Sequence, residues 1–170
     1  MARVFLISEK TLKENSVINN NVDGMYILPA IEYAQDAGLQ PLLGTKLYNK
    51  LMDLVEEGTI TGATDYKLLL DEYIKPYLVN KVTADIQIPL AFKLRNQGVV
   101  QNTSDNTYLP TLRDMQYVTQ NYENKANFYG NRMSDYLKAN RSKYPEYCSI
   151  DSCADMPSDS GAYNTGIYLG

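Results

Sequence analysis

The chain has 170 residues, of which 44% are hydrophobic and 21% charged, and this composition is typical of one globular domain with its own core. Its net charge of −4 argues against nucleic-acid binding through neutralised phosphates, although a local basic stripe is compatible with that average. The sequence has no histidine, the commonest general base and metal ligand.

Tyrosine is unusually frequent, with 15 residues. Its ring gives a large apolar body with one polar tip, which suits subunit contacts and cores equally well. The longest apolar run near the N-terminus is four residues. That is shorter than a signal peptide or a membrane helix needs, so we expect no membrane association and a location in the cytoplasm of the cell that makes the chain.

The first third of the chain predicts a short helix followed by two longer ones. The short helix covers 8–15, with a capping-box match at Thr11–Glu14, and the asparagines after it end the pattern. The next helix, at about 24–37, begins with Asp23 as its cap and should end at Gly38, the residue type that favours a left-handed terminator.

A turn over 39–43, closed by Gly44, should lead into a helix at about 45–57 with Thr45 as its cap. Apolar residues at Leu47, Leu51 and Leu54 give that helix one buried face.

Two long helices are predicted in the rest of the body. The first covers about 65–96 and should kink or break near Pro76 and Pro89. A polar loop over 101–107, flanked by two very short strands at 99–100 and 108–109, should form a hairpin. The second long helix covers about 111–142, and Gly130 inside it indicates a close backbone contact or a weak point. Its predicted buried stripe consists of Met115, Val118, Tyr122, Ala126, Tyr129, Met133 and Leu137.

The sequence therefore predicts an all-α fold: a helical bundle with two long helices joined by a polar hairpin-like loop, plus an extended C-terminal arm. We divide the chain into a helical domain over 1–146 and a tail over 147–170, which has three aspartates and no lysine or arginine. The tail is either a loose end or an arm that docks on a partner. The predicted partner-binding residues are Tyr163, Ile167, Tyr168 and Leu169.

No pattern in the chain predicts catalysis, a cofactor or a metal site. Two adjacent acidic pairs, Glu56–Glu57 and Asp71–Glu72, point in different directions on a helix and should be solvated. The glycines at 38 and 44 enclose apolar residues and lack the lysine of a phosphate-binding loop. Cys148 and Cys153 are either spectator thiols or a small disulfide or redox pair.

One stretch carries a family resemblance. The segment GLQPLLGTKLY (38–48), preceded by DGMYILPAIEYAQ (23–35) and followed by NKL (49–51), resembles the head–tail connector proteins of tailed bacteriophages, also called adaptor or head-completion proteins. The version that it resembles most is that of Bacteroides-type (crAss-like) phages. The resemblance covers roughly 4–143, with its specific part at about 23–51.

The resemblance implies a structural virion protein at the capsid–tail junction. Such proteins look like helical subunits that form a ring, usually of twelve copies, which contacts the portal protein and the next tail or ring protein. DNA would pass through the ring without specific binding. Twelve chains at −4 each would carry about −48, a charge that would keep DNA off the channel wall.

Two other functions stay open at this point. One is an unrelated helical scaffold or regulatory oligomer without catalytic activity, and the other is a small enzyme with an unrecognised site. A connector should form rings, alone or with the portal, whereas an enzyme would need a pocket with clustered polar groups.

Overall fold

The computed structural model describes residues 4–95, 98–101 and 111–147. The all-α class is confirmed, because the elements of these residues are helical apart from one two-stranded hairpin. The bounds are α1 Glu9–Asn15, α2 Gly24–Tyr33, η1 Ala34–Leu39, α3 Gln40–Leu43, α4 Thr45–Glu56, η2 Thr59–Thr61, α5 Thr64–Leu69, η3 Leu70–Ile74, α6 Lys75–Asp85, α7 Gln87–Ala91, β1 Phe92–Arg95, β2 Gly98–Gln101, α8 Leu112–Ala139 and η4 Arg141–Lys143.

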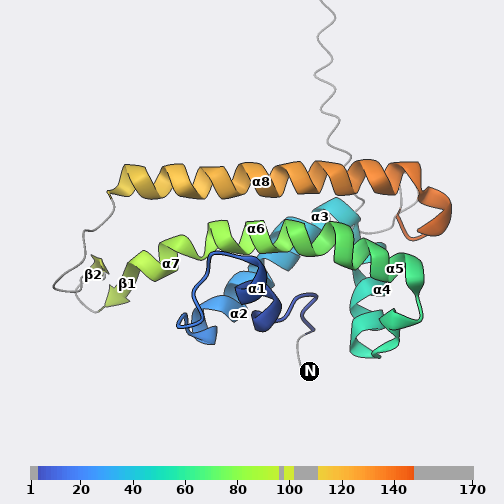
Figure 1. The fold of residues 1–170 in the computed structure, drawn as a ribbon, viewed down its shortest axis with the longest axis horizontal. Coiled ribbons are helices and arrows are strands. Elements are labelled where there is room, and N and C mark those ends of the chain that lie inside the picture. Colours follow the sequence, from blue (N-terminus) through green and yellow to red (C-terminus); the bar gives the residue numbers. More distant parts are fainter. Residues whose placement is uncertain (1–3, 96–97, 102–110, 148–170) are drawn as a thin grey trace, which may run out of the picture.

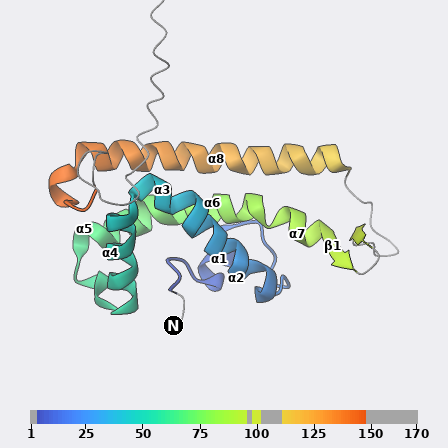
Figure 2. The same cartoon turned by 180° about the vertical axis from the view of Figure 1, so that it is seen from behind.

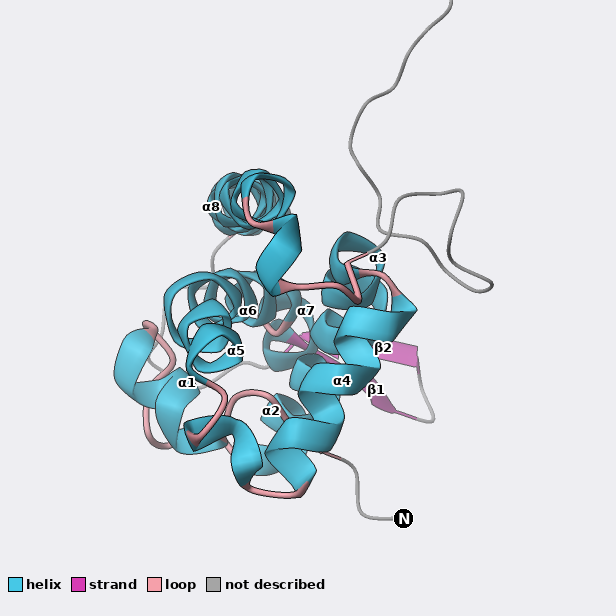
Figure 3. Ribbon diagram, turned by 90° about the vertical axis from the view of Figure 1, so that its right-hand side faces the viewer, coloured by secondary structure: helices cyan, strands magenta, loops and turns pink. Residues whose placement is uncertain are grey.

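Helix α8 forms one long side of the molecule and packs against α6, which runs beside it in the opposite direction (Figure 1). The short helices α1 and α2 lie on the other side of α6. Helices α4 and α5 are at one end and the hairpin is at the other, as the reverse view also shows (Figure 2). Viewed along the long axis, α8 lies at the edge of the molecule (Figure 3). Its outward side is therefore not covered by another described element.

The core is built on residues spaced four apart. One such series runs from α2 to α4, and every member is fully buried: Ile27, Ile31, Gln35, Leu39, Leu43, Leu47 and Leu51. A second series, Tyr66, Leu70, Ile74, Leu78, Val82 and Ile86, runs through α5 and α6 and is buried apart from the half-buried Tyr66. An α-helix advances about 100° per residue, so a spacing of four drifts by about 40° per step and cannot stay on one face for long.

Each series passes through a π-helical turn, η1 in the first and η3 in the second. In both, the residue just before a proline donates its N–H to the carbonyl five residues back: Gln40 to Gln35 before Pro41, and Lys75 to Leu70 before Pro76. A proline has no N–H and its ring clashes with the carbonyl four residues back. The wider π turn leaves room for the ring, and it takes up part of the drift of the buried series.

The prediction that a helix ends at Gly38 is wrong. The helical path continues through η1 and α3 and ends at Gly44, which has the positive φ of 76° that favours glycine. Gly38 has a different reason to be glycine, because a Cβ there would lie 2.6 Å from Tyr77 Oη. The turn predicted over 39–43 is accordingly helical, since the π turn accommodates Pro41.

The predicted cap at Thr45 is wrong, and the capping-box match in the first helix is not a cap. The cap of α1 is Ser8, whose hydroxyl accepts from the Thr11 N–H at 3.1 Å, so the match at Thr11–Glu14 lies inside the helix. Thr45 is the first residue of α4, which begins after Gly44 without a side-chain cap. The cap at Asp23 is confirmed, because its carboxylate accepts from the Met25 N–H at 3.1 Å.

The first long helix is shorter than predicted. Helix α6 ends at Asp85, whose carbonyl the ring of Pro89 would meet, and α7 ends at Ala91 rather than at Asn96. Phe92–Arg95 then pairs antiparallel with Gly98–Gln101, so 99–100 belong to a hairpin that begins earlier than predicted. The remainder of the predicted loop, 102–107, and its second strand at 108–109 lie outside the described residues.

The chain end of the described part is fixed by tyrosines. The Tyr144 hydroxyl donates to the Asp65 carbonyl at 2.9 Å, and the Tyr66 hydroxyl donates to Glu146 at 2.7 Å. The rings of Tyr73 and Tyr136 stack with their centroids 4.2 Å apart. Tyr147 is also buried, so the segment after α8 is held against α5, and its burial extends as far as this residue.

Candidate interaction surface on helix α8

Helix α8 begins at a complete capping box. The Thr111 hydroxyl accepts from the Asp114 N–H at 3.2 Å, and the Asp114 carboxylate accepts from the Thr111 N–H at 3.0 Å. Hydrogen bonds from the Thr111 hydroxyl and N–H hold the pKa of the Asp114 carboxyl below its ordinary value. The side chains of Thr111 and Asp114 therefore fix where the helix begins.

The inner face of α8 fixes the helix tightly against the body. Met115, Ala126, Met133 and Leu137 are buried along this face. A Cβ on Gly130 would lie 3.2 Å from Leu42 Cδ1 and 3.3 Å from Tyr77 Cε2, so the predicted close backbone contact at Gly130 is confirmed. Because α8 is held by packing on one side, its opposite side is a rigid surface.

The outer face of α8 is poor in charge and rich in exposed aromatic and amide groups. Tyr117, Asn121, Asn124, Phe128 and Asn131 follow one another at helical steps of four and three. The exposed fractions are 75% for Tyr117 and 63% for Phe128. Asparagine is a weak helix former, so helix propensity does not account for four of them in α8. Protein interfaces are enriched in aromatic residues and depleted of charge, and this face has that composition.

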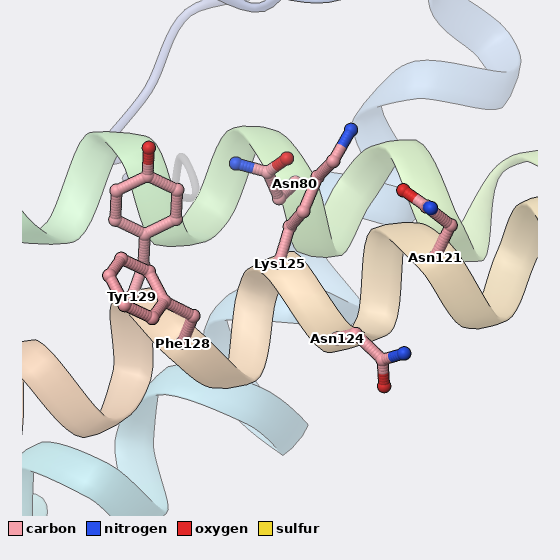
Figure 4. Close-up of a pocket in the computed structure, with 6 residues that line it drawn as sticks. All are labelled: Asn80, Asn121, Asn124, Lys125, Phe128 and Tyr129. Carbon is pink, nitrogen blue, oxygen red and sulfur yellow. The ribbon is translucent and has the colours of Figure 1, made fainter.

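A shallow groove of about 580 Å³ lies at the edge of this outer face. Asn80 of α6 lines it together with five residues of α8: Asn121, Asn124, Lys125, Phe128 and Tyr129 (Figure 4). The Asn80 amide donates to the Pro76 carbonyl at 2.8 Å, which orients its side chain. The amides, the ammonium group and the two rings offer hydrogen bonds and apolar contact side by side.

The C-terminal half of α8 and the turn after it are basic. Between residues 124 and 143 there are five basic side chains, Lys125, Arg132, Lys138, Arg141 and Lys143, against the single acidic Asp135. All five are exposed. The average charge of the chain is negative, so this is a local basic region, in which Lys143 pairs with Asp65 at 3.3 Å.

Comparison with protein families gives one match, to a family of unknown function, DUF6712, over residues 39–156. The matched residues run from the end of η1 through α8 and exceed half of the chain. The chain belongs to the DUF6712 family. No curated protein and no solved structure matches it.

In this DUF6712 chain, a second groove of about 470 Å³ lies where α7 meets the start of α8. Four of its eight lining residues are apolar, and these are Ile88, Phe92, Leu112 and Met115. Ile88 and Leu112 are 58% and 62% exposed, so they are accessible to a partner. Outer surfaces that favour contact with other molecules are thus present along most of α8.

The seam between α6 and α8 contains one carboxylate whose environment is unusual. Burial raises the pKa of Asp85, and Glu123 on α8 also raises it, although the Lys81 ammonium at 3.2 Å opposes both effects. Burial and the nearby Asp85 raise the pKa of Tyr77 to about 12. Asp85, Lys81 and Tyr77 all belong to α6, and the Glu123 carboxylate on α8 opposes the charge of Asp85.

The residues predicted to bind a partner, Tyr163, Ile167, Tyr168 and Leu169, lie outside the described residues, as do Cys148 and Cys153. Within the described residues, no group of three or more histidine, cysteine, aspartate or glutamate side chains is placed to hold a metal ion. No helix of the described part is long and apolar enough to span a bilayer. Of the predicted acidic pairs, Glu56 and Glu57 are exposed, and Asp71 pairs with Lys75.

The outer face of α8 was not among the sequence predictions. Those predictions followed the apolar residues of the helix and placed Val118 on the buried stripe, but Val118 is 42% exposed. The sequence signal for the outer face is a scarcity of charge. Between Asp114 and Arg132 the only charged residues are Glu123 and Lys125. A solvated helix face normally carries more charge than this.

Proposed function

We propose that this chain is a structural virion subunit without catalytic activity, which forms a ring below the portal of a tailed bacteriophage. The ring joins the capsid to the tail and continues the DNA channel. The observation that carries the proposal is the outer face of α8, a rigid surface with two exposed aromatic side chains and little charge. A surface of this composition suits permanent contact with other protein subunits.

A ring requires each subunit to contact its neighbour through two different surfaces. The side of α8 and the end with α7 and the hairpin face different directions, so a subunit can offer one surface to each neighbour (Figure 1). The position at the portal follows from the resemblance at 23–51. In the structure those residues form α2, η1, α3 and α4, whose buried leucines and isoleucines make up much of the core.

Negative-stain electron microscopy of the purified protein, alone and mixed with the portal protein of the same genome, tests the proposal. We expect rings, or rings that form only on the portal, and these images would give the symmetry directly. A monodisperse monomer that does not bind the portal would contradict the proposal. A discrete dimer would instead favour a helical scaffold or regulatory oligomer.

The Phe128→Ala variant connects this experiment to α8. Phe128 is largely exposed, so its removal should reduce ring formation without changing thermal stability. The matched control is Tyr33→Ala, which removes an aromatic side chain that is 59% exposed on α2, away from α8. Equal loss of rings in both variants would show that the α8 face has no special part in assembly.

A further inference from the structure

We propose that the acidic C-terminal segment, residues 148–170, of one subunit docks on the outer face of α8 of its neighbour. The receiving site is the groove beside Phe128 together with Lys125 and Arg132, which we call the basic-aromatic face. This inference rests on the proposed function, because it names the contact that holds adjacent subunits together in the ring. It commits to one occupant, a segment of a second copy of this chain.

Charge complementarity is the first argument. Residues 148–170 contain Asp151, Asp155 and Asp159 and no basic residue, while residues 124–143 carry five basic residues against one acidic. A basic stretch, residues 124–143, is thus followed closely in sequence by an acidic stretch of similar length, residues 148–170. Opposite potentials of this kind steer association and fix the orientation of two surfaces.

The second argument is that the cations are oriented by the fold. Lys125 Nζ lies 4.6 Å from the centroid of the Tyr122 ring, and the Arg132 guanidinium lies 5.2 Å from that of Tyr73. Phe128 lies between these two residues in the sequence, at i+3 from one and i−4 from the other, on the same side of the helix. The face therefore presents an aromatic side chain between two cations that are supported by rings.

The groove can bind a peptide through tyrosine rings and through backbone N–H and C=O groups. Amide side chains both donate and accept, so Asn80, Asn121 and Asn124 can pair with the N–H and C=O groups of an extended chain. Tyr163 of the segment supplies a ring for contact with Phe128 and Tyr129. Ile167 and Leu169 are apolar enough for the groove that Ile88 and Leu112 line.

The segment is long enough to reach a neighbour. It follows Tyr147, which is buried beside the C-terminal end of α8. Fully extended, 23 residues span at most about 80 Å, whereas the 28 residues of α8 span about 42 Å. One segment can therefore cover both the basic half of a neighbouring α8 and the groove at its start.

A charge-swap experiment with the full-length protein tests the proposal. The face variant carries Lys125→Glu and Arg132→Glu, and the tail variant carries Asp151→Lys, Asp155→Lys and Asp159→Lys. Each variant alone places like charges opposite each other, so we expect self-association by sedimentation velocity to weaken about tenfold or more. A mixture of the two variants pairs every tail with a face of opposite charge and should regain the association of the wild type.

Rescue on mixing occurs only when the tail of one molecule contacts the face of another. If the tail folds back on its own α8, neither variant can be rescued by the other, and the absence of rescue would overturn the proposal. Unchanged association in either single variant would also overturn it. The matched control, Lys10→Glu with Lys67→Glu, changes two exposed lysines on α1 and α5 and should associate as the wild type does.

A second measurement addresses a competing occupant of the basic region. A short labelled DNA duplex is titrated with wild type and face variant at physiological salt. Binding by the wild type that the face variant loses would assign the region to DNA and overturn the proposal. Electron microscopy distinguishes failure of the tail contact from failure of the connector function. Rings formed by both variants would contradict the tail contact but remain consistent with the connector function. Rescue on mixing in the absence of rings would support the tail contact and contradict the connector function.

Discussion

Tyr77 of α6 is packed against glycines of two other helical segments. Its ring lies close to Gly130 of α8 and its hydroxyl close to Gly38 of η1, and Leu42 of α3 also approaches Gly130. Both positions favour glycine because a Cβ there would lie too close to neighbouring side chains. A left-handed backbone is not the reason, since neither residue has a positive φ. A buried tyrosine, and not backbone conformation, therefore decides two of the glycine positions.

Substitution of Gly38 by alanine should destabilise the fold. The new Cβ would lie 2.6 Å from Tyr77 Oη, and overpacking of this kind costs about 1–3 kcal/mol in the free energy of unfolding. In the Gly38→Ala, Tyr77→Phe double variant the nearest ring atom would be Cζ at 3.6 Å, an ordinary contact, so part of the loss should be recovered. Urea unfolding of the four proteins of this cycle measures the coupling.

Gly62→Ala is the control for that cycle. Its Cβ would meet only the Thr59 carbonyl oxygen, at 3.5 Å, and we expect little change in stability. Additive effects of Gly38→Ala and Tyr77→Phe would show that the hydroxyl is not the obstacle.

At the scale of elements, the sequence predicted which segments are helical but not how the helices continue. The apolar pattern located α4 and α8 to within a few residues, because their buried faces follow the ordinary helical period. It did not predict that the helix continues through η1, because glycine and proline, here Gly38 and Pro41, usually end helices. The strict spacing of four from Ile27 to Leu43 was the available signal, because a wider turn takes up part of the drift of such a series.

The candidate surface was harder to predict than the fold. Sequence patterns mark buried faces by their apolar residues, whereas the outer face of α8 is marked by missing charge and by asparagines. Phe128 and Tyr129 are neighbours in sequence, yet one is 63% exposed and the other is half-buried. The position of α6 beside α8 decides which of the two rings is more exposed.

Removal of residues 148–170 should leave the helices intact. The buried core extends from Leu6 to Tyr147, so the cut belongs after Tyr147 and not before it. We expect unchanged helix content by circular dichroism and a thermal midpoint within a few degrees of the wild type, because the deletion removes no residue of that core. Attachment to neighbours or to the portal should weaken. A loss of helix content would contradict the division of the chain into a helical body and an arm.

The whole molecule is expected to lose stability in alkali. The folded state holds Tyr77 with a pKa of about 12, and burial also raises the pKa values of Tyr66 and Tyr144. In the unfolded chain tyrosine titrates near 10. Between these values the native state binds more protons than the unfolded state, so the free energy of unfolding falls as pH rises above about 10.

Tyr77→Phe isolates one part of that effect. For a shift from about 10 to about 12, the contribution of Tyr77 that is lost by pH 11 is about 1.4 kcal/mol. Urea unfolding between pH 8 and pH 11 should therefore show a smaller decline in the variant than in the wild type. Parallel declines would mean that Tyr77 ionises as easily in the folded state as in the unfolded state.

The π turn at Leu70–Ile74 has a consequence for insertions and deletions. It holds one residue more than the α-helical turn that the backbone would otherwise form. Loss of any one of its residues would turn this passage into an α-helical turn, in which the ring of Pro76 clashes with the carbonyl four residues back. Every side chain from Lys75 to Asp85 would also rotate by about 100° relative to α5, and Tyr77 would no longer meet both glycines. At this place the number of residues matters more than their identity.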